Sequence, residues 1–300
     1  MSLVRVRVPA TSANLGPGFD CLGLALDWWN EADFVLDGEG VQVEVHGEGA
    51  ESLPLGRDNL IAAAALRLYQ HTGSAAPHGL RIICNNTIPL GSGLGSSAAA
   101  VLQGLLGANR LLGDPLSMDQ ILVLAAELEG HPDNGAPALF GGLTAAVMTS
   151  NGVIYRRLAV PALALAVVVP QFSLPTRAAR AALPAQVALE DAVFNLSRST
   201  LVVEALRSAD LDLLGQVMDD RLHQPYRLPL IPGAQAAHQA ALDAGAVACV
   251  LSGAGPSLLA VARSDPRPLA AAMLAAFQAA GLSARAFTPV VSPIGAQVSG

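Results

Sequence analysis

Three glycines in alternate positions, Gly91, Gly93 and Gly95, stand directly before Ser96, Ser97 and a run of alanines. Because glycine has no Cβ atom, it allows successive backbone N–H groups to approach a ligand closely. If the alanine run forms a helix, the N-terminus of that helix adds unpaired N–H donors and partial positive charge. A tight turn alone would also use glycines, but the combination favours binding of a polyphosphate.

The glycine loop fits neither of two common nucleotide-binding patterns. Its spacing is GxGxG, whereas dinucleotide-binding loops require GxGxxG. The P-loop pattern requires a lysine, and this chain contains none, because all 17 of its basic residues are arginine. The lack of lysine also excludes the protein-kinase scheme and pyridoxal-phosphate Schiff-base enzymes. A pair of hydroxyls in place of lysine suggests that a divalent metal ion neutralises the phosphate charge.

Hydrophobic periodicity predicts the elements that position this loop. Apolar and polar residues alternate at 4–8 and 41–45, which is typical of half-buried strands. Residues 59–73 and 97–113 have the pattern of helices, and 79–90 is predicted to be a strand that runs into the loop. The glycines therefore lie between a strand and a helix N-terminus.

A further helix is predicted from Ser117 to Gly130. Gln120 completes a capping box with Ser117, and glycine is the usual residue just past a helix end. The polar residues HPDN, 131–134, follow at once at the exit of this helix.

The second half of the chain resumes the alternation of strands and helices. A short apolar run at 163–170 and a strand–loop unit at 246–262 are predicted strands, separated by helical segments that carry arginines. We expect a domain boundary at 155–165, which gives an N-terminal domain of residues 1–160 and a C-terminal domain of residues 161–300.

Composition restricts the partners and the location of the chain. Hydrophobic residues make up 52% of it, enough for a sizeable core. A net charge of −7 without a basic cluster argues against nucleic acid or an anionic membrane as the main partner, so we expect a small molecule. No segment has the pattern of a transmembrane helix or a signal peptide, and we expect a cytoplasmic location. Cys21, Cys84 and Cys249 are far apart and form no CxxC pair, which indicates neither a disulfide framework nor a zinc site.

Three segments resemble signatures of one enzyme family. The segment PLGSGLGSSAA is similar to the phosphate loop of the GHMP small-molecule kinases, named for galactokinase and for homoserine, mevalonate and phosphomevalonate kinases. VRVPATSANLGPGFDCLGLAL, which ends at Leu26, and LSGAGPSLLAV, Leu251–Val261, match two further signatures, so the resemblance spans almost the whole chain. The first of these, with EGHPDN and PYRLPLIPG, is most similar to the members that phosphorylate homoserine.

The resemblance implies an α+β fold of two domains. In the family, an N-terminal domain with a left-handed βαβ crossover is followed by a ferredoxin-like domain, and nucleotide and substrate bind in the cleft between them. It also implies that ATP phosphorylates the side-chain hydroxyl of L-homoserine with the help of Mg²⁺, and that two chains form a homodimer.

The resemblance also assigns the nucleotide and metal sites. The phosphates of ATP would bind at Pro89, Leu90, Gly91, Ser92, Gly93, Leu94, Gly95, Ser96 and Ser97. A second glycine loop, Ser252–Ser257, would support this phosphate loop. Ser97 and a glutamate of the next helix would hold Mg²⁺, through the oxygen ligands that this ion prefers.

Two glutamates, Glu127 and Glu129, compete for the metal role. They project about 200° apart on a helix, so at most one of them faces the site. Ile121, Leu124, Ala125 and Leu128 define the expected apolar face. Because Glu129 lies nearer to the centre of this face, we predict Glu129 as the ligand.

The acceptor pocket is assigned by the same resemblance. Asp20 would accept hydrogen bonds from the ammonium of L-homoserine, and Arg180 and Arg227 would hold its carboxylate. The hydroxyl region would be shaped by Asn14, His131 and Asn134, and Thr176 matches a further residue at the substrate.

The position that carries a catalytic aspartate in some relatives is Asn134, which cannot take a proton. Asp133 is adjacent but is expected to point elsewhere, and His131 could act only with suitable geometry. We therefore expect phosphoryl transfer driven by positioning and electrostatic stabilisation rather than by a strong base. Three alternatives stay open: another GHMP kinase of the mevalonate type, a phosphate-binding regulator without catalysis, and a nicotinamide-dependent oxidoreductase, which the spacing of the glycines disfavours.

Overall fold

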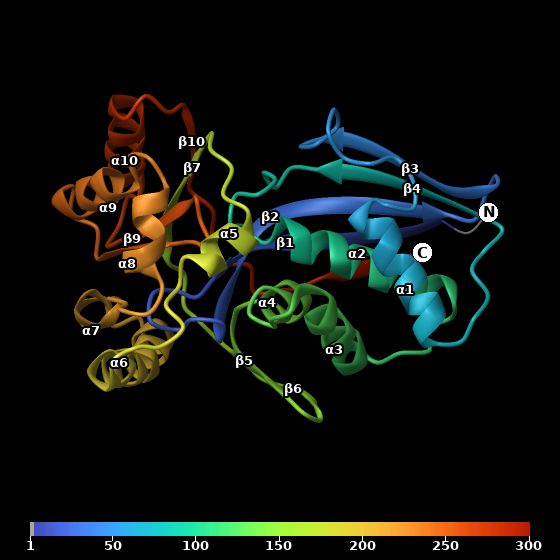
Figure 1. Ribbon diagram of the computed structural model, residues 1–300, viewed down its shortest axis with the longest axis horizontal. Helices are drawn as coiled ribbons and strands as arrows, with labels where there is room; N and C mark the ends of the chain where they lie inside the picture. The colour runs from blue at the N-terminus through green and yellow to red at the C-terminus, as the bar shows by residue number, and fades with distance from the viewer. Residues whose placement is uncertain (1–2) are drawn as a thin grey trace.

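The computed structural model describes residues 3–300 as two β-sheet domains that lie side by side (Figure 1). The N-terminal domain is built on a seven-stranded sheet of order β11-β1-β2-β4-β3, in which β5 pairs with β2 and with β6. Its strands are β1 (Leu3–Ala13), β2 (Leu22–Val35), β3 (Gly40–Gly47), β4 (Gly79–Asn86), β5 (Leu143–Thr149), β6 (Gly152–Leu158) and β11 (Gln297–Ser299).

Four helices pack against this sheet. They are α1 (Leu60–His71), α2 (Ser96–Leu111), α3 (Met118–Glu129) and α4 (Gly135–Phe140). Strands β3 and β4 are parallel and α1 connects them, which is the βαβ unit of this domain. The strands and helices predicted in this half are all present, with ends that differ by a few residues.

The C-terminal domain is a four-stranded antiparallel sheet of order β10-β7-β9-β8. Its strands are β7 (Ala164–Pro170), β8 (Ala248–Leu251), β9 (Leu258–Ala262) and β10 (Ala284–Phe287). The spatial order of fourth, first, third and second strand is that of a ferredoxin-like domain, as expected. The helices are α5 (Thr176–Ala181), α6 (Leu189–Ser208), α7 (Leu211–Val217), α8 (Gln224–Arg227), η1 (Leu228–Leu230), α9 (Ala234–Asp243) and α10 (Arg267–Ala279).

Strand β7 is buried on both faces and joins the two cores. Leu165, Val167 and Val169 belong to the large core that also contains the N-terminal sheet and its helices. Ala166 and Val168 face the smaller core under α9 and α10. Because neither face of β7 is solvated, its sequence is a continuous apolar run instead of an alternating one.

The end of the chain returns to the N-terminal domain. Strand β11 pairs antiparallel with β1; the backbone N–H of Gly142 donates to the carbonyl of Ser292, whose own N–H donates to the carbonyl of Ala25. The expected C-terminal domain of residues 161–300 thus contributes a strand to the first sheet, which sequence periodicity did not indicate. The polypeptide crosses between the domains twice.

Two findings bear on the compositional expectations. Within residues 3–300, no helix has the length and apolarity needed to cross a membrane. Cys84 and Cys249 are buried, which raises the pKa of each thiol to about 12, and Cys21 is half-buried.

Candidate functional site

The glycine loop connects β4 to α2 and needs its glycines for two physical reasons. Gly91, Gly93 and Gly95 have φ angles of 59°, 79° and 71°, in the left-handed region that disfavours other residues. A Cβ on Gly93 would lie 2.2 Å from the carbonyl oxygen of Ser252, and one on Gly95 would lie 2.0 Å from Thr11 Oγ1. The loop therefore has no side chains at Gly93 and Gly95, where other segments contact it and where α2 begins.

The second glycine loop supports the first, as the resemblance implied. Ser252 Oγ donates to the carbonyl oxygen of Gly93 at 2.8 Å, and the backbone N–H of Ser257 donates to the carbonyl of Ser92 at 3.1 Å. Gly253 N–H in turn donates to the carbonyl of Ala13 at the end of β1. Segments from both domains thus fix the shape of the phosphate loop.

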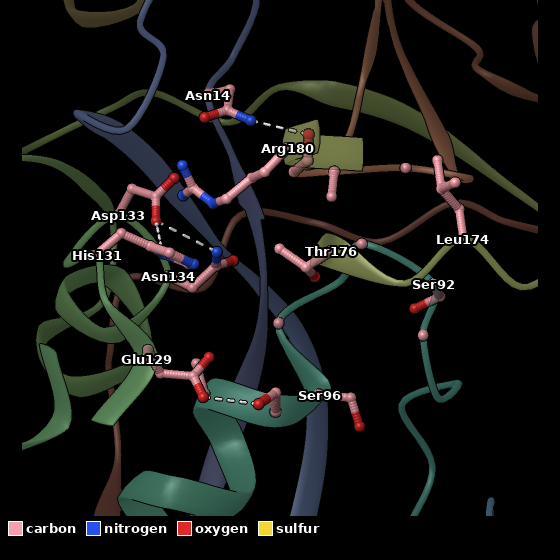
Figure 2. A pocket seen from close by; sticks show the side chains of 18 of the residues that line it. Asn14, Ser92, Ser96, Glu129, His131, Asp133, Asn134, Leu174, Thr176 and Arg180 are labelled. Atoms are coloured by element: carbon pink, nitrogen blue, oxygen red, sulfur yellow. Dashed lines mark hydrogen bonds and ion pairs between the residues drawn. The ribbon is translucent and has the colours of Figure 1, made fainter. Parts of the chain in front are cut away.

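A cavity of about 270 Å³ opens in front of this loop, between the two domains (Figure 2). It brings together every predicted acceptor and metal residue: Asn14, Asp20, Ser97, Glu129, His131, Asn134, Thr176, Arg180 and Arg227. The loop contributes Gly91, Ser92, Gly93, Gly95 and Ser96. Pro89 and Leu94 line neither this cavity nor the next one, and the side chain of Leu94 is fully buried.

A second cavity of about 220 Å³ lies on the other side of the loop and shares Gly91, Ser96 and Ser97 with the first. Leu90 lines this cavity, together with apolar side chains and the amide of Gln103. Nε2 of Gln103 is buried without a hydrogen-bond partner in the described part of the chain. This cavity was not predicted from the sequence, because its walls come from β2, α1, β4 and α2. The one signal in the sequence was Gln103, the polar residue in the otherwise apolar stretch 98–108 of α2.

The structure distinguishes the two glutamates of α3. Glu129 accepts a hydrogen bond from Ser97 Oγ at 2.7 Å, whereas Glu127 is exposed and lies 3.8 Å from Arg67. Burial raises the pKa of Glu129, an effect that the hydrogen bond from Ser97 partly offsets. The expected apolar face was wrong at one position: Leu128 is 41% exposed and lines the cavity instead of the core.

The capping of α3 places Glu129 at this point. Ser117 and Gln120 form the predicted capping box, and Gly130 ends the helix in the left-handed conformation. No group of three or more His, Cys, Asp or Glu in residues 3–300 could hold a metal by itself. Mg²⁺ commonly takes one or two protein oxygens and completes its shell with phosphates and water, so Ser97 and Glu129 fit this ion.

Asp20 and Arg180 form an ion pair across the cavity. Both guanidinium Nη atoms of Arg180 donate to the Asp20 carboxylate, at 2.8 and 2.9 Å. The hydrogen bond that Arg180 donates to Asp20 is the main reason that the pKa of Arg180 is raised. Asp20, which was predicted to bind the ammonium, and Arg180, which was predicted to bind the carboxylate, thus neutralise each other. Both side chains are about one-third exposed.

Arg227 is a different kind of site residue, because it is 1% exposed and lacks a carboxylate partner within 4.0 Å in residues 3–300. Burial, followed by the charge of Arg180, lowers its pKa. A buried cation without a counter-charge is costly, and an anion in the cavity would relieve that cost.

The hydroxyl region contains a chain of hydrogen bonds. Thr11 Oγ1 donates to Oδ1 of Asn134 at 2.7 Å, and Nδ2 of Asn134 donates one hydrogen to Asp133 Oδ1 at 3.4 Å, which leaves its second hydrogen for the cavity. His131 Nδ1 lies 2.5 Å from Oδ1 of the buried Asp133. Burial disfavours protonation of His131, but the hydrogen bond and charge of Asp133 outweigh it, and its pKa is raised. Sequence analysis did not identify Thr11, and it expected Asp133 to point elsewhere.

Comparison with known proteins gives matches over nearly the whole chain. The model for the GHMP kinases N terminal domain matches residues 59–142, and that for the GHMP kinases C terminal matches residues 202–281. The chain is 47% identical to a homoserine kinase of Moorella thermoacetica over 278 residues, which cover 92% of this chain and 93% of that protein.

Solved structures agree with these matches. The crystal structure of homoserine kinase from Cytophaga hutchinsonii is similar with a TM-score of 0.89 and 33% identity, over 100% of this chain and 98% of that one. A mevalonate kinase of L. major shares the fold at a TM-score of 0.72 with 18% identity, over 96% of each chain.

Proposed function

The chain belongs to the GHMP kinase family, and we propose from this that it transfers the terminal phosphoryl group of ATP to the side-chain hydroxyl of L-homoserine. The product is O-phospho-L-homoserine, in a step of threonine biosynthesis. The observation that carries the choice of acceptor is the buried Arg227, which has no carboxylate partner within 4.0 Å among residues 3–300, in the same cavity as Asp20 and the phosphate loop.

The charges of the cavity match a zwitterionic acceptor. The carboxylate of L-homoserine supplies the counter-charge that Arg227 lacks, and its ammonium is a partner for Asp20. As the ligand binds, Asp20 pairs with its ammonium instead of with Arg180, and Arg180 pairs with its carboxylate instead of with Asp20. Mevalonate has no ammonium to replace Arg180 at Asp20, so its carboxylate would compete with Asp20 for Arg180, which disfavours it as the acceptor.

The two cavities divide the nucleotide between them. We place the phosphates of ATP against the N–H groups of the glycine loop and the N-terminus of α2, where backbone donors and partial positive charge replace the missing lysine. The nucleoside then lies in the second cavity, where apolar walls bury the base and Gln103 has a free hydrogen-bonding group. Gly91, Ser96 and Ser97 line both cavities and mark the passage from one to the other.

Mg²⁺ would be held by Ser97 and Glu129, and when bound it would neutralise phosphate charge. In the free protein, the hydrogen bond between these two side chains keeps both oxygens at the edge of the phosphate loop. Glu129 thereby keeps a hydrogen-bond partner while its pKa is raised by burial.

The remaining side chains orient the reacting hydroxyl. Thr11 fixes the amide of Asn134, whose Nδ2 donates into the cavity and cannot accept a proton. Asp133 holds the imidazole of His131 by one nitrogen, which aims the ring at the cavity. The acceptor oxygen forms its new bond to phosphorus as the bond to ADP breaks, and its proton leaves late to phosphate or water.

The test is ADP release at pH 7.5 with ATP and Mg²⁺, comparing L-homoserine with mevalonate, galactose, L-serine and no acceptor. We expect turnover with L-homoserine alone. Turnover with another acceptor would overturn the assignment of the pocket and leave the phosphate loop intact. No turnover with any acceptor would favour a non-catalytic regulator.

A further inference from the structure

Arg227 is held in place by weak contacts with neutral groups. Its guanidinium lies 3.3 Å from the carbonyl oxygens of Ala179 and Gly253, and 3.5 Å from Nδ1 of His223. All three distances are at the long end of the hydrogen-bond range. Since none of these acceptors is charged, the orientation of Arg227 depends on the rigidity of its neighbours, and His223 is the one side chain among the three acceptors.

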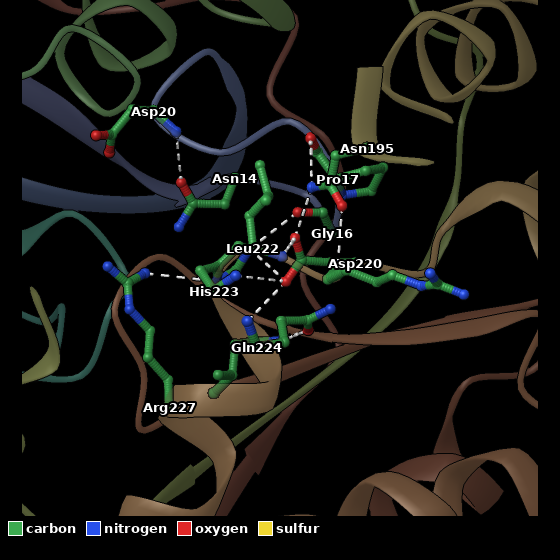
Figure 3. A network of polar contacts seen from close by, with 12 residues as sticks. Asn14, Gly16, Pro17, Asp20, Asn195, Asp220, Leu222, His223, Gln224 and Arg227 are labelled. Carbon is green, nitrogen blue, oxygen red and sulfur yellow. Dashed lines mark hydrogen bonds and ion pairs between the residues drawn. The ribbon is translucent and has the colours of Figure 1, made fainter. Parts of the chain in front are cut away.

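The imidazole of His223 is fully buried and has a defined tautomer (Figure 3). Its Nε2 lies 2.9 Å from the carbonyl oxygen of Gly16, which can only accept, so Nε2 carries the hydrogen. Burial lowers the pKa of His223, and the nearby charges of Asp220, Arg227 and Asp20 do not reverse that direction. The neutral ring therefore presents the lone pair of Nδ1 to Arg227.

The same ring also contacts the loop that carries Asp20. His223 stacks on Phe19 at a centroid distance of 5.1 Å, and Phe19 directly precedes Asp20. The Phe19 ring in turn lies 5.0 Å from the guanidinium carbon of Arg227. One imidazole thus contacts the loop at Gly16 and Phe19, and the buried arginine on its other edge.

A buried carboxylate fixes the backbone of His223 itself. Asp220 accepts the backbone N–H groups of Leu222, His223 and Gln224 at 3.0, 3.0 and 2.6 Å, and the amide of Asn195 at 2.7 Å. These bonds form the entry to α8, which ends at Arg227. Figure 3 shows the polar contacts of Asp220 and of His223, including the contact between His223 and Arg227.

We propose that His223 is a positioning residue of the acceptor pocket, which holds the guanidinium of Arg227 at a fixed position relative to the loop that carries Asp20. It thereby sets the spacing between the group that binds the carboxylate and the group that binds the ammonium. This inference rests on the proposed function. It predicts an effect on the acceptor and not on ATP, because the ring contacts the acceptor residues and none of its hydrogen bonds reaches the phosphate loop.

Two substitutions separate the nitrogens of the ring. His223→Gln can keep a donor near Gly16 but removes the acceptor that faces Arg227, whereas His223→Asn can keep that acceptor and removes the donor. For His223→Gln we expect the KM for L-homoserine to rise about tenfold, which is the value of one hydrogen bond to a charged group, with the KM for ATP within about twofold of wild type. His223→Asn should recover part of the loss, and His238→Gln on α9 is the matched control with wild-type constants.

The outcomes distinguish this role from the proposed function. No turnover of L-homoserine by the wild type would overturn the proposed function itself. Wild-type turnover, with an unchanged KM for L-homoserine in both variants, would overturn only the role of His223. Equal rises in the KM for ATP and for L-homoserine would also overturn it, because they would indicate general structural damage.

A measurement on the wild type keeps the inference testable if the variants do not fold. Nitrogen NMR of ¹⁵N-histidine protein reports the tautomer of each ring, with His223 identified by substituting the other five histidines in turn. We expect a neutral ring protonated at Nε2 at pH 7.5, whose Nδ1 resonance shifts on addition of L-homoserine. A ring protonated at Nδ1, or no shift with L-homoserine, would contradict the inference.

Discussion

Glu127 and Glu129 lie two positions apart on α3 and have opposite surroundings. Glu127 faces solvent near Arg67, whereas Glu129 contacts Ser97 at the edge of the phosphate loop. The chemistry of these carboxylates is identical, so only the helical rotation between them places one beside Ser97 and the other at the surface.

Substitution of these two residues tests that assignment with a matched control. Glu129→Gln removes the charge beside Ser97 and should lower kcat by about 100-fold or more and raise the Mg²⁺ concentration needed for half-maximal rate. Glu127→Gln removes the same charge from the surface and should leave both values near wild type. Initial rates over a Mg²⁺ titration provide the measurement, and an unchanged Mg²⁺ dependence in Glu129→Gln would contradict the metal role.

A local pattern predicted the glycine loop, because its residues are contiguous in sequence, and the other residues predicted for the cavity followed from the family resemblance. Thr11, Asp133 and Gln103 were missed or misplaced because their roles arise only from contacts between elements. Thr11 acts by contacting Asn134, which is distant in the chain and borders the loop only after folding. The pairing of Asp20 with Arg180 was likewise unpredictable, since each had been assigned to a ligand.

At the scale of elements, the two glycine loops act as one unit. The second loop leaves no room for a side chain at Gly93 of the phosphate loop. Ser252 and Ser257 hold the two loops together by hydrogen bonds to the carbonyl groups of Gly93 and Ser92. The strand and helix around the first loop were predictable from periodicity. The short helix α8 was not predictable, because its four residues depend on the buried carboxylate of Asp220.

A comparison of two glycines separates close packing from backbone strain. Gly93 and Gly73 both have positive φ, but a Cβ on Gly93 would meet a carbonyl oxygen at 2.2 Å and one on Gly73 would meet nothing within 4 Å. Gly73→Ala should therefore cost about 1 kcal/mol of stability and leave the KM for ATP unchanged. Gly93→Ala should also raise the KM for ATP about tenfold or more, because the loop must shift. Equal KM values for ATP in the two variants would show that the contact does not matter for binding.

At the scale of the molecule, the domains share one large core, and the site lies where they meet. Fold class followed from the family resemblance, since alternating strands and helices are compatible with several architectures. Strand β11 could not be foreseen, because three residues carry too little pattern to identify a strand.

The buried His223 makes the stability of the whole fold depend on pH. Burial lowers the pKa of His223 in the folded protein. Below the pKa of about 6.5 that a histidine has in the unfolded chain, the unfolded chain therefore binds a proton that the folded protein does not bind. Its contribution to stability is therefore complete above that pH and is lost as the pH falls toward the folded pKa. Urea unfolding at pH 7.5, 6.5 and 5.5 should show a smaller loss for His223→Gln than for wild type or His238→Gln. Parallel losses would contradict the prediction. The raised pKa of His131 acts in the opposite direction in all three proteins and cancels in the comparison.

The pairing of β1 with β11 has a consequence for the synthesis of the protein. The strand that carries Thr11 is translated almost three hundred residues before its neighbour β11. Until β11 is made, the nascent N-terminal domain has an open edge at β1, to which a chaperone or another nascent chain could add a strand. The sheet that carries Thr11 therefore gains its last strand only after the whole C-terminal domain has been translated.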